Sequence, residues 1–343
     1  MSKIDIKAMI KDLKKNELTE LISVAQEVLS TLFNSSEIRD NVKESRFSKG
    51  YECPKCQCKD VNKNGKSNGR QRYICKRCRT SFDEFTMSPF SNTKLGLDKW
   101  IKYCELMILG LSIRKCAEEV GVGVKTSFYM RHRILDVINL SLKNDKVEGI
   151  VEVDECFIKE SFKGNHSKST TFVMPRNPRK RGKGKNDKKK RGISKEQICI
   201  ETAIDRKGNI LMSAVCNGRI TTNQIINFFD NKICEDATFC VDSHKSYMAI
   251  KDKLNIELKQ VPRGKSMIDS VYHLQHINAL HSSFKRWLMT FNGVSTKYIN
   301  NYLAWFKFLQ LSKKNKKNDR IKDMLVNVAT KDTYVTRATI RNR

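Results

Sequence analysis

The sequence predicts an α/β protein with small modules ahead of its main domain, and three observations support this. From residue 149 onward, apolar runs of strand length alternate with amphipathic helical segments. Ahead of them lie a region with four paired cysteines and a helix, glycine-containing turn and helix. We therefore expect a helical segment, a zinc ribbon, a helix-turn-helix, an α/β domain and a basic tail, at residues 1–47, 48–90, 91–146, 147–312 and 313–343.

The charge balance of the chain indicates a polyanionic partner. Its 343 residues include 66 lysines and arginines against 37 acids, a formal net charge of +29. Such an excess binds the phosphates of nucleic acid through counterion release. No apolar run approaches the roughly 20 residues of a membrane span, and no apolar signal region begins the chain. We expect a cytoplasmic protein that binds nucleic acid and no membrane.

Residues 1–47 carry apolar side chains at helical spacing, which predicts one or two helices capping the next module. The module at 48–90 holds C-x2-C, 18 further residues and C-x2-C, formed by Cys53, Cys56, Cys75 and Cys78. Two such pairs complete the tetrahedron of thiolates that structural Zn²⁺ prefers. A zinc ribbon is the favoured interpretation, and a redox or disulfide role is the alternative. The other eight of the twelve cysteines are scattered, as in a reducing compartment.

The segment 91–146 is predicted to be helical. Residues 111–120 and 126–135 have helical patterns, and a turn around Gly121 separates them. Ser112 is a plausible N-cap of the first helix, and Ala117 is a small residue suited to a close helix–helix contact. The pattern favours a helix-turn-helix, and a plain helical hairpin is the alternative.

The α/β domain begins with three strands that should form a meander, and helix-separated strands follow. The expected strands are 150–158, 198–204, 210–216, 238–241 and 255–261. One expected helix begins at Thr221 or Thr222, and three more cover residues 244–253, 272–290 and 295–312. A meander followed by helix-separated parallel strands is the topology of ribonuclease H, so we expect a ribonuclease H-like catalytic domain.

Two segments are rich in basic residues. The insertion 159–195 is rich in lysine, arginine and glycine, and we interpret it as a loop that grips DNA without reading its base sequence. A solvated disordered loop is the alternative. The tail 313–343 is also basic and is expected to be partly disordered.

Two aspartates are placed where strands present ligands. Asp154 lies on the first strand and Asp242 directly follows the fourth. Alternation puts Glu152 on the same strand face as Asp154, so Glu152 should lie near the site without being a ligand. The alternative for each aspartate is an ordinary acid near a strand end.

A later helix supplies the remaining candidates. Asn278, His281 and Lys285 step by three and four residues and so share one helix face, with Asn278 separated from Asp242 by 35 residues. Asp154, Asp242 and Asn278 together predict a site for two Mg²⁺ ions, and the Lys285 ammonium is suited to a phosphate. A polar surface face is the alternative for this helix, and Asp269, which should precede the helix, is the rival third ligand. A zinc site built from His273, His276 and His281 is disfavoured because no acid or cysteine completes it.

The chain resembles bacterial insertion-sequence transposases of the DDE superfamily with an N-terminal zinc ribbon, over about residues 50–310. The resemblance is carried by the four cysteines, V151-E-V-D-E155, D242-S-H-K-S-Y247, I277-N-A-L-H281 with Lys285, F291-N-G-V-S-T-K-Y298 and N301-Y-L-A-W-F306. It implies that Asp154 and Asp242 are the first two catalytic acids. The third ligand is glutamate in most DDE enzymes and falls on Asn278 here, with Lys285 seven residues later.

The resemblance implies a DNA transposase that acts in the bacterial nucleoid. It would hydrolyse the transposon ends and join the freed 3′-hydroxyl to target DNA, with Asp154 bridging two Mg²⁺ ions that Asp242 and Asn278 complete. The zinc ribbon and helix-turn-helix would bind the terminal inverted repeats, and the protein is expected to form a homo-oligomer on DNA. The alternatives are a ribonuclease H-like nuclease or resolvase, and a non-catalytic DNA-binding regulator derived from a transposase.

Overall fold

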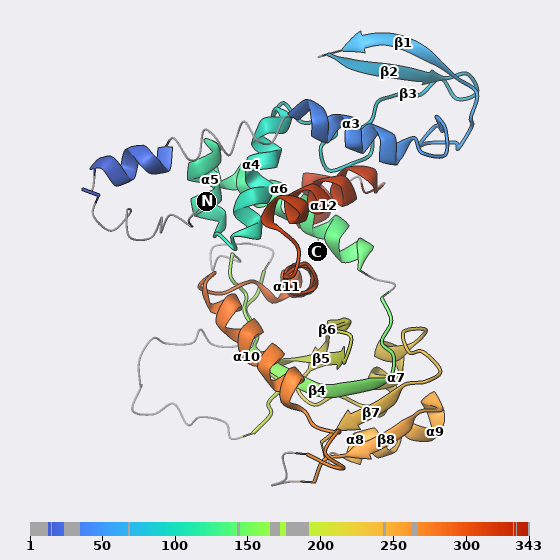
Figure 1. Cartoon of the computed structure of the whole chain (residues 1–343), viewed down its shortest axis with the longest axis vertical. Coiled ribbons are helices and arrows are strands. Elements are labelled where there is room, and N and C mark those ends of the chain that lie inside the picture. Colours follow the sequence, from blue (N-terminus) through green and yellow to red (C-terminus); the bar gives the residue numbers. More distant parts are fainter. Residues whose placement is uncertain are drawn as a thin grey trace, which may run out of the picture. The chain divides into compact units, whose positions relative to one another are not determined.

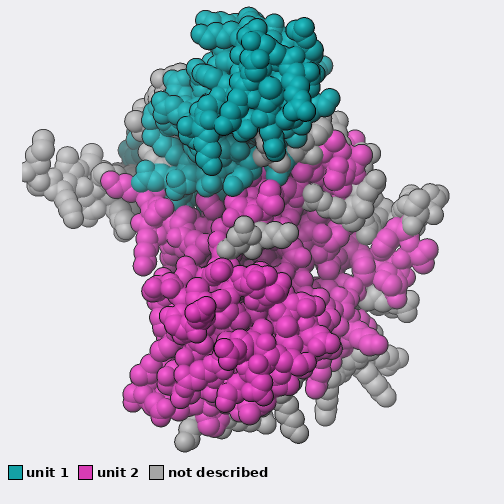
Figure 2. All heavy atoms as spheres, turned by 90° about the vertical axis from the view of Figure 1, so that its right-hand side faces the viewer, with its two compact units in different colours: residues 1–109, 116–122, 317–334 teal, residues 110–115, 123–316, 335–343 magenta. Residues whose placement is uncertain are grey.

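The computed structural model describes residues 13–14, 16–23, 35–67, 69–142, 145–164, 172–175, 192–242, 245–262, 267–331, 333 and 335–341. The chain divides into two compact units, coloured separately in Figure 2. Unit 1 comprises residues 1–109, 116–122 and 317–334, and unit 2 comprises residues 110–115, 123–316 and 335–343. The predicted 91–146 segment therefore contributes to both units. Much of the predicted N-terminal helical segment lies outside the described residues, but residues 16–23 are helical.

Unit 1 contains a small antiparallel sheet and several helices (Figure 1). The sheet has the order β1 (Val61–Ser67), β2 (Arg70–Cys75) and β3 (Ser81–Phe82). Helices α3 (Ser35–Arg46), α4 (Leu97–Ile108) and α12 (Lys317–Thr330) contact one another. Helix α5 (Ile113–Val120) begins in unit 2 and ends in unit 1.

Helix α12 corrects the expectation of a disordered tail. Five of its apolar side chains are fully buried, namely Ile321, Met324, Leu325, Val328 and Ala329. Their spacing of three and four residues makes one apolar face, and the Arg46 Nη1 of α3 donates to the Ala329 carbonyl at 3.0 Å. Despite its basic flanks, this part of the tail has enough apolar side chains to fold against α3 and α4.

The centre of unit 2 is a five-stranded mixed sheet. Its strands are β4 (Ile150–Lys159), β5 (Gln197–Asp205), β6 (Ile210–Asn217), β7 (Thr238–Val241) and β8 (Glu257–Gln260), in the order β6-β5-β4-β7-β8. β4, β5 and β6 pair antiparallel, whereas β7 pairs parallel with both β4 and β8. The predicted meander followed by parallel strands is confirmed.

The helices of unit 2 follow the predicted order, except that one expected helix is divided in two and the unpredicted α13 lies in the tail. They are α6 (Val124–Ser141), α7 (Thr222–Phe229), α8 (Lys245–Met248), α9 (Lys251–Leu254), α10 (Gln275–Met289), the short η1 (Thr296–Tyr298), α11 (Ile299–Leu311) and α13 (Arg337–Arg341). Helix α7 begins with a capping box between Thr221 and Gln224. The single helix expected over 244–253 is instead the two short helices α8 and α9.

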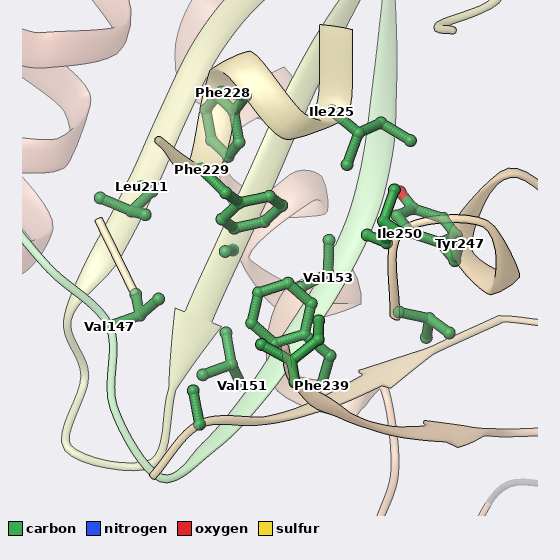
Figure 3. Packing of buried hydrophobic residues seen from close by; sticks show 14 of the residues in the cluster. Val147, Val151, Val153, Leu211, Ile225, Phe228, Phe229, Phe239, Tyr247 and Ile250 are labelled. Atoms are coloured by element: carbon green, nitrogen blue, oxygen red, sulfur yellow. The ribbon is translucent and has the colours of Figure 1, made fainter. Parts of the chain in front are cut away.

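Two apolar clusters cover the two faces of this sheet. On one face, Val151, Val153 and Phe239 of the strands pack with Ile225, Phe228 and Phe229 of α7 (Figure 3). On the other, Cys156 and Ile200 pack with Leu280 and Phe284 of α10. Alternation along β4 therefore places the side chains of Glu152 and Asp154 on the face that α10 covers. Among the described residues, no helix is long and apolar enough to cross a membrane.

Candidate active site

The register of the sheet places Asp154 beside Asp242. Glu152 of β4 is paired with Cys240 of β7 in parallel register. Two residues further along each strand lie Asp154, within β4, and Asp242, directly after the last residue of β7. Neighbouring strands are about 4.8 Å apart. The two carboxylates predicted to act together are therefore neighbours at the end of β7.

The charges around Asp154 confirm this proximity. Burial, together with the negative charges of Glu155 and Asp242, raises the pKa of Asp154 to about 7, although the positive charge of Lys285 partly opposes this rise. The pKa of Asp154 thus responds to both other charged candidates that the sequence predicted. A cation bound between the aspartates would remove the repulsion and favour the ionised carboxylate.

Helix α10 brings two of its three predicted residues to Asp154. His281 Nδ1 lies 3.7 Å from Asp154 Oδ2. Burial, together with the charge of Lys285, lowers the pKa of His281 to about 4. Although the distance alone would allow an ion pair, His281 is neutral at physiological pH. Lys285 is exposed, and its positive charge lowers the pKa of Asp154.

Asn278 lies in the first turn of α10 and is exposed. It precedes His281 by one turn, so both are on the same side of the helix. Asp269, the rival third ligand, is exposed in a turn before α10 and has a left-handed φ of 47°. Its charge acts on Lys259 of β8. Asp269 is therefore outside the helix, as expected from the sequence.

Two buried polar atoms near Asp154 lack a hydrogen-bond partner within the described part of the chain. They are Nε2 of His281 and Oγ1 of Thr202, the residue opposite Asp154 in the β4–β5 pairing. A buried polar atom without a partner is costly unless water or a ligand satisfies it. The surroundings of Asp154 are therefore suited to a polar occupant.

Glu152 has a role that the sequence did not reveal. Its side chain is 1% exposed, and its Oε1 accepts from Arg206 Nη1 at 2.5 Å and contacts His276 Nδ1 at 2.7 Å. Its Oε2 accepts the Ile277 backbone N–H at 3.0 Å. A carboxylate at a helix N-terminus is stabilised by the free N–H groups and the helix dipole. Glu152 therefore fastens the first turn of α10 to β4.

His273 completes a cluster with Glu152 and His276 whose ligand atoms lie within 4.8 Å of one another, a spacing that could hold a metal ion. The Arg206 guanidinium contacts both Glu152 and His276. Because this fixed positive charge would repel a metal ion, we interpret the cluster as a structural clamp. The three histidines do not converge, since His281 lies at Asp154 instead. The expectation that no acid would lie beside His273 and His276 was wrong, because Glu152 contacts both.

A second acidic pair lies on the opposite face of the sheet. Glu155 and Glu201 are paired across β4 and β5, and the Tyr247 hydroxyl donates to Glu201 Oε1 at 3.1 Å. Figure 3 shows Tyr247 beside Ile250 at the edge of the apolar cluster. Burial raises the pKa of Glu201 well above its usual range, and the charge of Glu155 adds to this. Tyr247 thereby ties the segment after Asp242 to β5.

The four predicted cysteines of unit 1 converge. Their Sγ atoms lie 3.5 Å apart for Cys53–Cys78, 3.6 Å for Cys56–Cys75 and 3.4 Å for Cys56–Cys78. A tetrahedral site with bonds of about 2.3 Å has edges of about 3.8 Å. Each pair is followed by a left-handed residue, Gln57 or Arg79, whose N–H donates to the carbonyl of the first cysteine. The two knuckles are alike and form a cluster that could bind a metal ion.

Helices α5 and α6 occur where the sequence predicted them. The Lys115 N–H donates to Ser112 Oγ at 3.4 Å, so Ser112 caps α5 as expected. From α6, Ser127 Oγ donates to the Ile113 carbonyl at 2.8 Å, and Arg131 Nη2 donates to the Leu111 carbonyl at 2.6 Å. These bonds fix the beginning of α5 to α6.

Comparison with known proteins places the chain among mobile-element proteins. Residues 146–310, which contain the mixed sheet with α10 and most of α11, match the family described as ISXO2-like transposase domain. An uncharacterized protein in transposable element ISH50 of Halobacterium salinarum is 25% identical over 264 residues, which cover 76% of this chain and 86% of the relative.

A solved structure described as a pre-cleavage Mos1 transpososome is 13% identical and covers 66% of this chain and 75% of its own. Its TM-score is 0.23. This similarity is too low to support an argument about fold or mechanism.

Proposed function

Because this chain belongs to the insertion-sequence transposases of the DDE type, we propose that it cleaves transposon ends and joins the freed 3′-hydroxyl to target DNA by two-metal phosphodiester transfer. The observation that carries the proposal is the β4–β7 register, which makes Asp154 and Asp242 neighbours. The family implies the use of divalent metal ions. We infer that these ions are Mg²⁺.

The residues present are suited to Mg²⁺. Asp154, Asp242 and Asn278 offer oxygen atoms, the donors that this hard cation prefers. The mutual repulsion of the two aspartates favours a bound cation. The partnerless atoms of His281 and Thr202 favour a polar occupant. Bound metal ions would supply activation of the attacking oxygen and stabilisation of the leaving oxygen.

Each remaining residue has a role in binding or orientation. Asp154, Asp242 and Asn278 would hold the two ions through their side-chain oxygen atoms. Lys285 is exposed and carries a charge close to Asp154, so its ammonium is suited to orient a phosphate of the scissile strand. His281 is neutral and buried, and it would support Asp154 without repelling a cation.

The other modules support recognition of DNA. The strand order β6-β5-β4-β7-β8 agrees with our inference of a ribonuclease H-like domain. The distances among the four cysteines are those expected for structural zinc, and we infer a zinc ribbon in unit 1. We infer that the ribbon and the α5–α6 helix-turn-helix bind the terminal repeats. The core of the basic insertion that would grip DNA, residues 165–171 and 176–191, lies outside the described residues.

Strand cleavage of a DNA duplex carrying one element end tests this proposal. Asp154→Asn and Asp242→Asn should each reduce Mg²⁺-dependent cleavage by about 100-fold or more, because each removes a ligand of the reacting centre. Asp252→Asn is the matched control, since Asp252 is an exposed acid of α9 in the same unit. Cleavage by either site variant at the rate of the control would refute the proposal.

The same assay decides the third ligand. Asn278→Ala should lose most of the activity, and Asn278→Asp should retain part of it, because a carboxylate oxygen can replace the amide oxygen. Asp269→Ala should cleave normally, since Asp269 is exposed in the turn before α10. If Asp269→Ala were inactive and Asn278→Ala active, the assignment of Asn278 would be wrong.

A further inference from the structure

Unit 2 contains a cavity of about 760 Å³ that the catalytic proposal does not use. It is lined by the beginning of α5, the first half of α6, residues 290–295 between α10 and η1, Tyr298 and Tyr302, and Lys163 and Gly164 after β4. We call it the α6 cavity. Its volume is in the range of sites that bind small organic groups, about 300–1,000 Å³. It is thus large enough for one nucleotide.

Aromatic rings form one side of the α6 cavity. The ring centroids of Phe128 and His132 are 4.3 Å apart, and those of His132 and Tyr298 are 4.2 Å apart. Phe128 is only half-buried, so its ring is accessible from the cavity. Flat aromatic surfaces bind nucleobases of any sequence by stacking.

Cations surround the same space. Arg114, Lys115 and Lys125 are exposed and line the cavity. Lys163 Nζ donates to the Phe291 and Asn292 carbonyls at 3.1 and 2.9 Å. Burial lowers the pKa of Lys163, and the charge of Arg114 adds to this effect. Of the side chains recorded as lining the cavity, none is acidic. Cations crowded without a counter-charge favour an anionic occupant.

The walls of the cavity are preformed. The bonds from Ser127 and Arg131 described above hold the first residues of α5 against α6. The Arg131 guanidinium also lies over the Trp305 ring, 4.8 Å from its centroid. A cavity held by buried hydrogen bonds and stacked rings needs little ordering when it binds its ligand.

We propose that the α6 cavity binds one unstacked nucleotide of a DNA strand. The base lies against the ring of Phe128, which the buried rings of His132 and Tyr298 support, and its flanking phosphates contact Arg114, Lys115, Lys125 and Lys163. An intact base pair does not expose its ring faces, so the nucleotide must leave the stack or come from single-stranded DNA. The proposal rests on the proposed function in taking DNA as the substrate, and it adds a site away from the aspartates.

Photo-crosslinking tests the proposal where it would act. The full-length protein is irradiated with a single-stranded thymidine oligonucleotide carrying one 5-iodouracil, which couples to aromatic rings in contact with it. We expect the crosslinked peptide to contain Phe128, His132 or Tyr298. Crosslinks confined to other peptides would overturn the proposal, as would equal crosslinking of these residues to the fully paired duplex.

Matched variants identify the cavity as the source of the crosslink. Val124→Asp places an acid at the cavity, whereas Leu140→Asp places one elsewhere on α6, and the two side chains are 50% and 47% exposed in the wild type. Val124→Asp should abolish the crosslink and Leu140→Asp should not. Phe128→Leu, which keeps an apolar side chain, should weaken the crosslink roughly tenfold. Equal crosslinking by Val124→Asp and Leu140→Asp would contradict the proposal.

Two further experiments distinguish this site from a mononucleotide site and from the catalytic site. Thymidine monophosphate at the nucleotide concentration of the probe should not displace it, and full displacement would make the cavity a mononucleotide site instead. Asp154→Asn should crosslink normally. The crosslink requires no strand cleavage, so it would still form if the catalytic proposal were wrong. Conversely, absence of the crosslink would not affect the cleavage assay that tests Asp154.

Discussion

At the scale of single residues, β4 presents acidic side chains in different environments on the two faces of the sheet. Asp154 faces α10, where its proximity to Asp242 favours a cation. Glu155, the next residue, faces the other side of the sheet and is paired with the fully buried Glu201. Glu201 has Tyr247 as its hydrogen-bond donor. One face therefore gathers carboxylate oxygens that a bound cation would keep ionised, and the other face favours the protonated form of a carboxyl group within the apolar core.

Glu201 makes a testable contribution to pH-dependent stability. Its folded-state pKa is raised, so between the unfolded-state pKa of about 4.3 and the folded value the native protein holds a proton that the unfolded chain releases. The stability present below about pH 4 is therefore lost as the pH rises through the folded pKa. Glu201→Gln retains a hydrogen-bond acceptor without the titration.

Urea denaturation at about pH 5 and about pH 8 measures this difference. Relative to the wild type, Glu201→Gln should gain stability at the higher pH. Glu235→Gln, a change at an exposed acid of the same unit, should follow the wild type at both values. Parallel pH dependence of all three proteins would show that Glu201 is not protonated in the fold.

At the scale of elements, the placement of α10 decides the geometry of the site. Glu152 fastens its first turn to β4 through the Ile277 N–H, and Arg206 neutralises the buried carboxylate. This anchor also sets the positions of Asn278, His281 and Lys285, because they belong to the same helix. Glu152 is thus a positioning residue, two positions before Asp154 on β4.

Arg206→Gln tests this anchor, with Lys207→Gln as the matched control because Lys207 pairs with Glu148 at the surface. The Arg206 change leaves the buried Glu152 charge less well compensated, at a cost of about 1–3 kcal/mol. Hydrogen exchange should accelerate in the first turns of α10 and stay unchanged with Lys207→Gln. Unchanged exchange with Arg206→Gln would mean that the clamp does not hold the helix.

Local pattern predicted the strands and helices of the site within a few residues. The apolar runs of β4 and β7 and the spacing of Asn278, His281 and Lys285 identified the elements, since these signals are local. The anchor was not predictable from local pattern, because Glu152 binds Arg206, 54 positions later in the sequence, and Ile277, 125 positions later. Its neighbour His276 was considered only as a metal ligand. The α6 cavity likewise requires residues from four separate segments.

At the scale of the whole molecule, residues 317–334 belong to the same compact unit as residues 1–109. Helix α12 packs with α3 and α4, and Lys322 pairs with Glu37 at 2.7 Å. The basic composition of residues 313–343 suggested disorder. Composition alone does not reveal that five apolar side chains of α12 share one buried face. The two compact units therefore do not follow the linear order of the predicted domains.

Leu325→Ala should destabilise the protein by about 2–5 kcal/mol, because it deletes a fully buried side chain from α12. Asn327→Ala, at an exposed position of the same helix, should change stability by about 0.5 kcal/mol or less. Thermal denaturation of the full chain compares them. Equal melting temperatures for the two variants would show that α12 is not part of the folded core.

Exchange of a ligand atom tests most directly whether Asp154 and Asp242 bind the catalytic metal ions. Sulfur is a poor ligand for Mg²⁺ and a better one for the softer Mn²⁺. Strand cleavage by Asp154→Cys and Asp242→Cys should be lost in Mg²⁺ and partly restored in Mn²⁺, whereas Asp154→Ala and Asp242→Ala should be inactive in both. Cleavage in Mg²⁺ at the wild-type rate by the cysteine and alanine variants would contradict the assignment of these two aspartates.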